Sequence, residues 1–82
     1  MLKDVDAFAH PAYEAGRATA VRRARENPGE CCTVYWDGKA IFVRMSVAAP
    51  PPNSKVVCIA QVWDANTVQV RFDGAHSEWV KQ

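Results

Sequence analysis

An Asp-Gly pair between two β-prone segments is the feature that most constrains the fold of this sequence. Asp37-Gly38 separates residues 31–36 from residues 39–47, and both segments are rich in β-branched and aromatic side chains. Asp-Gly favours the tight turns that join antiparallel strands, because glycine readily adopts the positive φ angles that these turns require. A two-residue turn at this position predicts the pairs Trp36–Lys39, Val34–Ile41 and Cys32–Val43.

This register places the apolar side chains of both strands on one face of the sheet. The side chains predicted to share that face are Cys32, Val34, Trp36, Ile41, Val43, Met45 and Val47. Because successive side chains point to opposite faces of a strand, the turn chemistry and the hydrophobic pattern agree independently. The first hairpin is therefore expected to supply much of the core.

A second hairpin is predicted from residues 55–63 and 67–72, joined by the three-residue loop Asp64-Ala65-Asn66. With Asn66 in the left-handed region, the predicted pairs are Val62–Val68, Ala60–Val70 and Cys58–Phe72. This register directs Val57, Ile59 and Trp63 to the opposite face. The three prolines at 50–52 end the preceding strand, and the connection is compatible with a meander or with the second hairpin beside the first strand.

The segment from Pro11 to Glu26 predicts a helix, because it is rich in Ala, Arg and Glu and has no internal proline. Pro11 suits the first turn, and Asn27-Pro28-Gly29 provides a stop. On a helical wheel the face predicted to be buried consists of Tyr13, Gly16, Ala20 and Ala24, with Val21 at its flank. Such small residues allow the helix to approach the sheet closely, so the sheet must supply the bulk of the core.

Together these elements predict an α+β fold with one N-terminal helix packed on a roughly four-stranded antiparallel sheet of two hairpins. At 82 residues the chain is expected to form a single domain, residues 1–82, because it is too short for two cores. In the tail after residue 73, Ser77 is positioned to cap one closing turn. Trp79 is expected to dock on the core, since large aromatic side chains bury much area.

Composition points away from several classes of protein. The chain has no apolar run of the roughly 18 residues that a membrane span needs, and its start lacks the layout of a signal peptide. Three cysteines, two of them adjacent, predict reduced thiols and a cytoplasmic protein. No metal-ligand spacing and no phosphate-binding loop occurs, so no metal or cofactor is expected. His10 and His76 sit in no catalytic motif, which favours a non-enzymatic protein with no assigned catalytic residue.

An apolar surplus on the sheet face away from the helix gives the first functional hypothesis. The candidate interface residues are Tyr35, Phe42, Arg44, Ile59 and Trp63. Aromatic and arginine side chains are enriched in protein interfaces. We therefore expect a protein-interaction or regulatory module that self-associates through this face, with a homodimer as its simplest form. The alternative is that the prolines at 50–52 and the tail fold back over it.

Two other hypotheses use the helix. Its arginines, Arg17, Arg22, Arg23 and Arg25, could contact the phosphates of a nucleic acid, although a net charge of +1 provides no strong long-range attraction. The third hypothesis is small-molecule binding or catalysis in a pocket between the helix and the sheet. A cavity lined by a polar group such as His10 or Arg17 would favour it.

Overall fold

The computed structural model describes residues 4–72 and 76–81 of the chain. Within these residues, two helices precede five strands. The helices are α1 (Asp4–Phe8) and α2 (Tyr13–Glu26). The strands are β1 (Cys32–Trp36), β2 (Ile41–Met45), β3 (Lys55–Asp64), β4 (Thr67–Phe72) and β5 (Ser77–Lys81).

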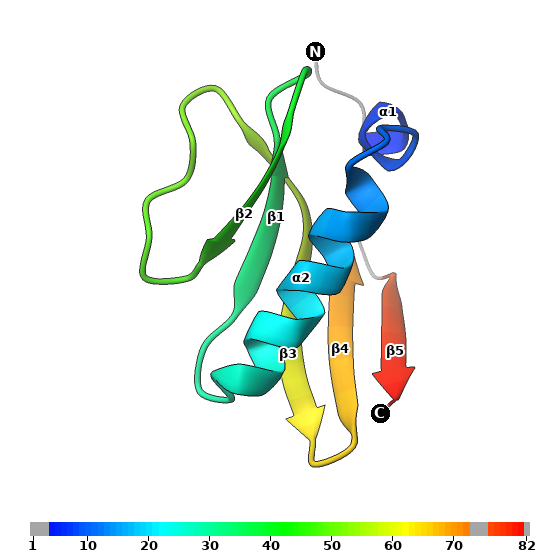
Figure 1. Ribbon diagram of the computed structural model, residues 1–82, viewed down its shortest axis with the longest axis vertical. Helices are drawn as coiled ribbons and strands as arrows, with labels where there is room; N and C mark the ends of the chain where they lie inside the picture. The colour runs from blue at the N-terminus through cyan, green and yellow to red at the C-terminus, as the bar shows by residue number, and fades with distance from the viewer. Residues whose placement is uncertain (1–3, 73–75, 82) are drawn as a thin grey trace.

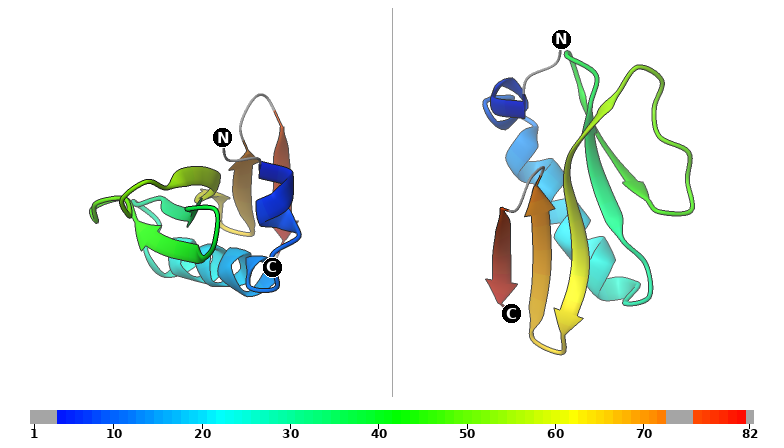
Figure 2. Two further views of the ribbon diagram at one scale, coloured as in Figure 1. Left: turned by 90° about the horizontal axis from the view of Figure 1, so that it is seen from above. Right: turned by 180° about the vertical axis from the view of Figure 1, so that it is seen from behind.

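The strands form one antiparallel sheet in the order β2-β1-β3-β4-β5. The second hairpin therefore lies beside the first strand, because β3 pairs with β1. α2 crosses one face of this sheet, here called the helix face (Figure 1). No described helix covers the opposite face, here called the far face, which is seen from behind in Figure 2. The predicted α+β fold is confirmed, and β5 is a fifth strand that the sequence did not reveal.

α2 has the predicted small buried stripe. It begins at Tyr13, two residues after the predicted start at Pro11, and ends at Glu26 as expected. After its last turn, Asn27 Nδ2 donates a hydrogen bond to the Arg23 carbonyl oxygen at 2.9 Å, which satisfies one of the acceptors left open at a helix end. The buried residues of α2 are Tyr13, Gly16, Ala20, Val21 and Ala24.

The loop of the first hairpin is longer than predicted. Its strands pair Cys32 with Met45, Val34 with Val43 and Trp36 with Ile41, so residues 37–40 form the loop. Asp37 Oδ1 accepts hydrogen bonds from the backbone N–H groups of Lys39 (2.8 Å) and Ala40 (2.9 Å), and Gly38 has a φ of 97°. The Asp37 carboxylate thus organises a wider turn. The predicted register is wrong by two residues, and this even shift leaves the paired side chains on their predicted faces.

The register of the second hairpin is confirmed, with the pairs Cys58–Phe72, Ala60–Val70 and Val62–Val68. Its loop differs from the prediction. Asp64 pairs with Thr67, which leaves Trp63 as an extra residue at a register shift. Asn66 is not left-handed, because Asn53 is the one described non-glycine residue with a positive φ. Asp64 Oδ1 instead accepts a hydrogen bond from the Asn66 backbone N–H at 2.8 Å.

Two valines lie outside their predicted environments. Val57, expected on the far face, is only 1% exposed and belongs to the core. The register of β1 against β3 shifts at this point, which allows Val57 and Cys58 to be buried together while Val56 is 40% exposed. Val47, expected on the core face, lies beyond the end of β2 and is exposed.

The tail forms an edge strand. Of this tail, residues 76–81 are described, and residues 74, 75 and 82 lie outside the described part of the chain. Ser77 begins β5, so it does not cap a turn. Val80 pairs with Val68 of β4 and packs against the core. Trp79 is half exposed on the far face, so the prediction that it docks on the core is wrong.

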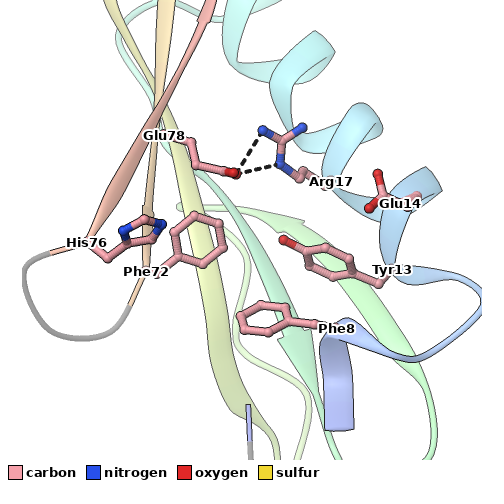
Figure 3. Close-up of a pocket in the computed structure, with 7 residues that line it drawn as sticks. All are labelled: Phe8, Tyr13, Glu14, Arg17, Phe72, His76 and Glu78. Carbon is pink, nitrogen blue, oxygen red and sulfur yellow. Dashed lines mark hydrogen bonds and ion pairs between the residues drawn. The ribbon is translucent and has the colours of Figure 1, made fainter. Parts of the chain in front are cut away.

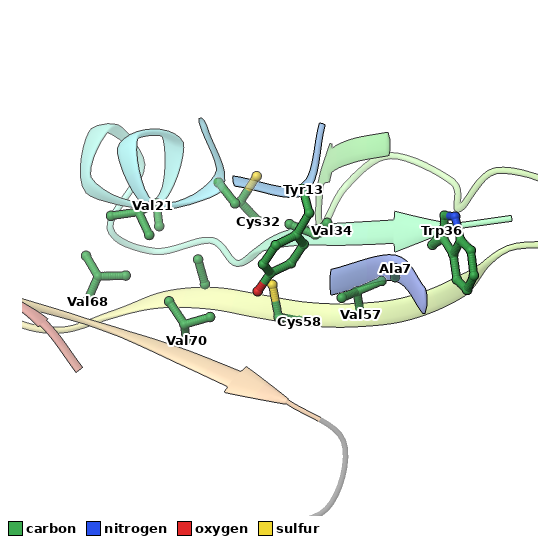
Figure 4. Close-up of a cluster of buried hydrophobic side chains, with 13 residues drawn as sticks. Ala7, Tyr13, Val21, Cys32, Val34, Trp36, Val57, Cys58, Val68 and Val70 are labelled. Atoms are coloured by element: carbon green, nitrogen blue, oxygen red, sulfur yellow. The ribbon is translucent and has the colours of Figure 1, made fainter. Parts of the chain in front are cut away.

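The sheet supplies most of the buried volume, as the small stripe of α2 requires. The largest fully buried side chains are Val34, Val57, Val68, Val70, Cys32 and Cys58, all of which lie in strands. Figure 4 shows these side chains gathered between the strands and the helices, with Ala7 of α1 closing one end. The core therefore depends on how closely α2 can approach the sheet.

Substitution of Gly16 tests this close approach. A Cβ atom at Gly16 would lie 2.9 Å from Ile41 Cγ2, a methyl group fixed close to the backbone of β2. We expect Gly16→Ala to lower the free energy of unfolding by about 1 kcal/mol, because overpacking outweighs the gain in helix propensity. Urea denaturation measures the change.

Ala18→Gly is the matched control for this experiment, because Ala18 is exposed on the same helix. It should cost about 1 kcal/mol through helix propensity alone. If Gly16→Ala instead stabilised the protein by a similar amount, α2 would not be held against Ile41 as the structure indicates.

Candidate functional site

A cavity of about 600 Å³ opens between the N-terminal part of α2 and the β4–β5 edge of the sheet (Figure 3). Four ring side chains line it: Phe8, Tyr13, Phe72 and His76. Three charged side chains complete the lining: Glu14, Arg17 and Glu78. Phe8 comes from α1, and three lining residues come from α2. Phe72 ends β4, His76 directly precedes β5, and Glu78 lies in β5. The cavity therefore joins segments from both ends of the described chain.

The rings of the lining pack against one another. Phe8 meets Tyr13 with ring centroids 5.1 Å apart and meets Phe72 at 5.7 Å, and both pairs are edge-to-face. Phe72 also meets His76 at 5.2 Å, with the two rings tilted by 39°. Edge-to-face packing restricts the motion of each ring and leaves some ring faces directed elsewhere. The lining is thus a connected aromatic cluster, which we call the aromatic wall: Phe8, Tyr13, Phe72 and His76.

An ion pair crosses the cavity from the helix to the edge strand. Arg17 Nε and Nη2 both donate to Glu78 Oε1, at 3.2 and 2.9 Å. Both side chains are partly exposed, so the pair is expected to add no more than about 1 kcal/mol to stability. Glu14, on the same helix and exposed to solvent, forms no ion pair with another described residue. The lining therefore carries two carboxylates and one guanidinium.

Tyr13, one ring of the aromatic wall, lies beside the buried thiol of Cys58. Burial raises the pKa of the Cys58 thiol to about 11, and the opposing effects of the nearby Arg17 guanidinium and Tyr13 hydroxyl offset this only in part. Burial also raises the pKa of Tyr13 above its ordinary value, and the nearby Cys58 adds to this effect. Both groups are therefore protonated at neutral pH, and neither is an activated nucleophile.

Of the two side chains named in the pocket hypothesis, Arg17 lines the cavity and His10 does not. His10 Nδ1 accepts a hydrogen bond from the Ala12 backbone N–H at 3.0 Å, and its Nε2 lies 2.9 Å from the Lys39 carbonyl oxygen. His10 therefore ties the connection between the helices to the first hairpin loop. The other six lining residues were not predicted as site residues: Phe8, Tyr13, Glu14, Phe72, His76 and Glu78. Residues 77–80, Ser-Glu-Trp-Val, do not alternate between polar and apolar side chains, so no period-two pattern marked β5 or Glu78 in the sequence.

The structure places all five candidate interface residues on the far face, but it exposes them unequally. Tyr35 and Phe42 pair across β1 and β2, and both are only half-buried. Arg44 Nη1 donates to the Ala49 carbonyl oxygen at 3.1 Å, so this arginine holds the loop that follows β2. Ile59 is also half-buried, whereas Trp63 is 62% exposed.

Trp63 has an aromatic neighbour that the sequence did not predict. Its ring meets that of Trp79 edge-to-face, with centroids 4.9 Å apart. Trp79 is itself 49% exposed. The most exposed apolar part of the far face is therefore this pair, which we call the tryptophan pair, at the β3 and β5 side of the sheet. Two contiguous exposed tryptophans are unusual for a small monomer.

The four arginines of the nucleic-acid hypothesis are directed to different parts of the fold. Arg17 pairs with Glu78. Arg23 Nη1 lies 3.4 Å from the Val43 carbonyl oxygen, and Arg25 Nη2 lies 3.5 Å from that of Val80. Arg22 is exposed. They do not form one basic surface, so nucleic-acid binding stays a prediction that no contact among the described residues favours.

Within residues 4–72 and 76–81, no group of three His, Cys, Asp or Glu side chains is arranged to hold a metal ion. None of the described helices is long and apolar enough to cross a membrane. No protein family, curated protein or solved structure matches the chain. The arguments for function therefore rest on the cavity and on the far face.

The buried thiol predicts a specific loss of stability in alkali. The pKa of Cys58 is about 11 in the folded protein, against an ordinary value of 9.0. Between these two values the folded state holds the proton more tightly than the unfolded state, so stability is full below pH 9 and falls as the pH rises toward 11. We expect the free energy of unfolding to fall by about 1 kcal/mol per pH unit from this group.

Urea denaturation across this pH range measures the slope in the wild type and in two variants. Cys58→Ala should reduce the slope because the titrating thiol is absent. Val57→Ala is the control, since it truncates a neighbouring buried side chain that does not titrate, and it should lower stability without changing the slope. Equal slopes in the wild type and Cys58→Ala would contradict the assignment.

Proposed function

We propose that this protein binds a small organic ligand in the cavity between α2 and the β4–β5 edge. The observation that carries the proposal is a cavity of about 600 Å³ that combines an aromatic wall with charged side chains. Ligand sites typically enclose about 300–1,000 Å³ and pair apolar surface with a few polar groups. This cavity has both properties.

The parts of the lining have distinct uses in binding. The rings of Phe8 and Phe72 offer apolar area, and the edge-to-face contacts of Phe8 with both Tyr13 and Phe72 hold these rings in place. Apolar area removed from water is the main source of affinity for small ligands. Arg17 and Glu78 are already oriented by their own hydrogen bonds, so a polar ligand loses little free energy in ordering them.

Binding is better supported than catalysis. Tyr13 lines the cavity and lies close to the buried Cys58 thiol, and burial keeps both of these groups protonated at neutral pH. A nucleophile needs an adjacent base or a lowered pKa. We therefore propose a binding protein rather than an enzyme.

Ligand screening by NMR tests this proposal. A set of small aromatic compounds that includes cations, anions and uncharged members is titrated into the isotope-labelled protein. We expect at least one member to shift the amide signals of Phe8, Tyr13, Phe72 and His76 together. His76→Ala should weaken that binding about tenfold or more, because it removes one ring of the aromatic wall.

Glu26→Ala is the control variant for the screen, because Glu26 is exposed at the far end of α2 and does not line the cavity. It should bind as the wild type does. Shifts that map to another surface, or binding that His76→Ala leaves intact, would count against the cavity as the site.

Self-association through the far face is the second candidate function, and the tryptophan pair is the observation that favours it. Trp63 and Trp79 are 62% and 49% exposed, and they touch each other. Exposed aromatic clusters of this kind are typical of the centre of a protein interface. We propose that a second copy of the chain covers the pair, as a regulatory or interaction module would require.

Sedimentation at increasing protein concentration tests self-association. The wild type is expected to show a dimer, and Trp63→Arg should shift it to a monomer with an unchanged circular dichroism spectrum. Val47→Arg is the control, since Val47 is 81% exposed but lies outside the sheet, and it should still dimerise. A monomeric wild type at high concentration would remove this candidate.

The cytoplasmic location is also a proposal. It is supported by three cysteines that are all unpaired, as expected in a reducing compartment.

A further inference from the structure

We infer that the ligand class of the cavity is the small organic cation, such as a substituted amine or a quaternary ammonium compound. This inference rests on the proposed function of the cavity and narrows it. Its basis is the charge balance of the lining together with the faces of the aromatic wall. Both features favour positive charge, and they do so independently.

The charge balance starts from the ion pair. Arg17 directs both Nε and Nη2 to a single oxygen of Glu78, so its charge is compensated within the cavity wall. Glu78 Oε2 accepts no hydrogen bond from another described residue and remains open to a ligand donor. Glu14 adds a second carboxylate with no described ion-pair partner. An anionic ligand would meet excess negative charge, whereas a cation would balance it.

The aromatic wall adds the second preference. Phe8, Tyr13 and Phe72 line one cavity, and the centroid of the Phe8 ring lies 5.1 Å from that of Tyr13 and 5.7 Å from that of Phe72. The face of an aromatic ring carries partial negative charge and attracts a cation within about 6 Å of the centroid. Several rings that line one side of the cavity can therefore attract an ammonium group bound there. This attraction does not apply to an uncharged group of the same shape.

The combination distinguishes this cavity from an ordinary apolar pocket. An uncharged ligand would gain apolar contact with Phe8 and Phe72, but it would leave the excess negative charge of the lining unbalanced. A cation gains the same contact and provides the counter-charge. Its affinity should therefore fall as salt rises, because Glu14 is exposed and its attraction is screened.

Three probes of the same shape and different charge test the inference. Choline carries a trimethylammonium group, dimethylbutanol replaces that group with tert-butyl, and dimethylbutyrate combines tert-butyl with a carboxylate. NMR titration at neutral pH measures the affinity of each probe from the signals of the cavity residues. We expect choline to bind about fivefold more tightly than dimethylbutanol, and dimethylbutyrate to bind most weakly.

A matched pair of variants identifies the source of the preference. Glu14→Gln should lower the affinity for choline about threefold and leave that for dimethylbutanol unchanged. Glu26→Gln, on the same helix but outside the lining, should change neither affinity. Phe8→Leu keeps an apolar side chain but removes a ring face, so it should weaken choline more than dimethylbutanol.

The outcomes distinguish a failure of the cation inference from a failure of the proposed ligand-binding function. If dimethylbutanol or dimethylbutyrate binds in the cavity as tightly as choline, the cation inference is overturned and the ligand-binding function stands. If none of the three probes shifts the cavity signals and the aromatic screen is also negative, both are overturned. A preference for choline that Glu14→Gln reduces about threefold and Glu26→Gln leaves unchanged supports both.

Discussion

The structure depends on the close contact between Gly16 of α2 and Ile41 of β2. A glycine there, with Ala20 and Ala24 further along the stripe, allows the helix backbone to lie near β1, β2 and β3. The same contact sets the helix off-centre, so that β4 and β5 extend past it (Figure 1). The larger side chains Tyr13 and Arg17 then bridge the remaining width. The cavity is the space that this offset leaves, because no helix backbone fills it.

Features that depend on local chemistry could be predicted from the sequence. The helix follows from propensity and its proline boundaries, and the sheet faces follow from the alternation of side chains. The face assignment of Cys32, Val34 and Trp36 survived a wrong register, because the Asp37 carboxylate lengthened the loop by two residues. A register shift by an odd number of residues would have turned every side chain of the strand to the opposite face of the sheet. Val57 shows the opposite case, since one register irregularity was enough to move it into the core.

The cavity could not be predicted in the same way, because its residues meet only through tertiary structure. Phe8 and Phe72 lie in segments that the sequence connects by no motif, and they are brought together by α1 packing beside the end of β4. Arg17 was identified from its charge, but its partner Glu78 belongs to an edge strand too short to be recognised. Likewise, Trp63 was identified as exposed, whereas Trp79 was assigned to the core. Both residues, Glu78 and Trp79, lie in β5, the strand that the sequence analysis did not predict.

β5 connects the two candidate functions through the alternation of its side chains. Glu78 and Val80 face the helix, where they meet Arg17 and the core, and Trp79 faces the opposite side with Trp63. A ligand that bridges Arg17 and Glu78 would hold β5 against α2, and the position of β5 determines where Trp79 meets Trp63. Ligand binding and self-association therefore use different surfaces of the protein. They share one short strand, which among the described strands pairs with β4 alone, and the stability of that pairing governs both.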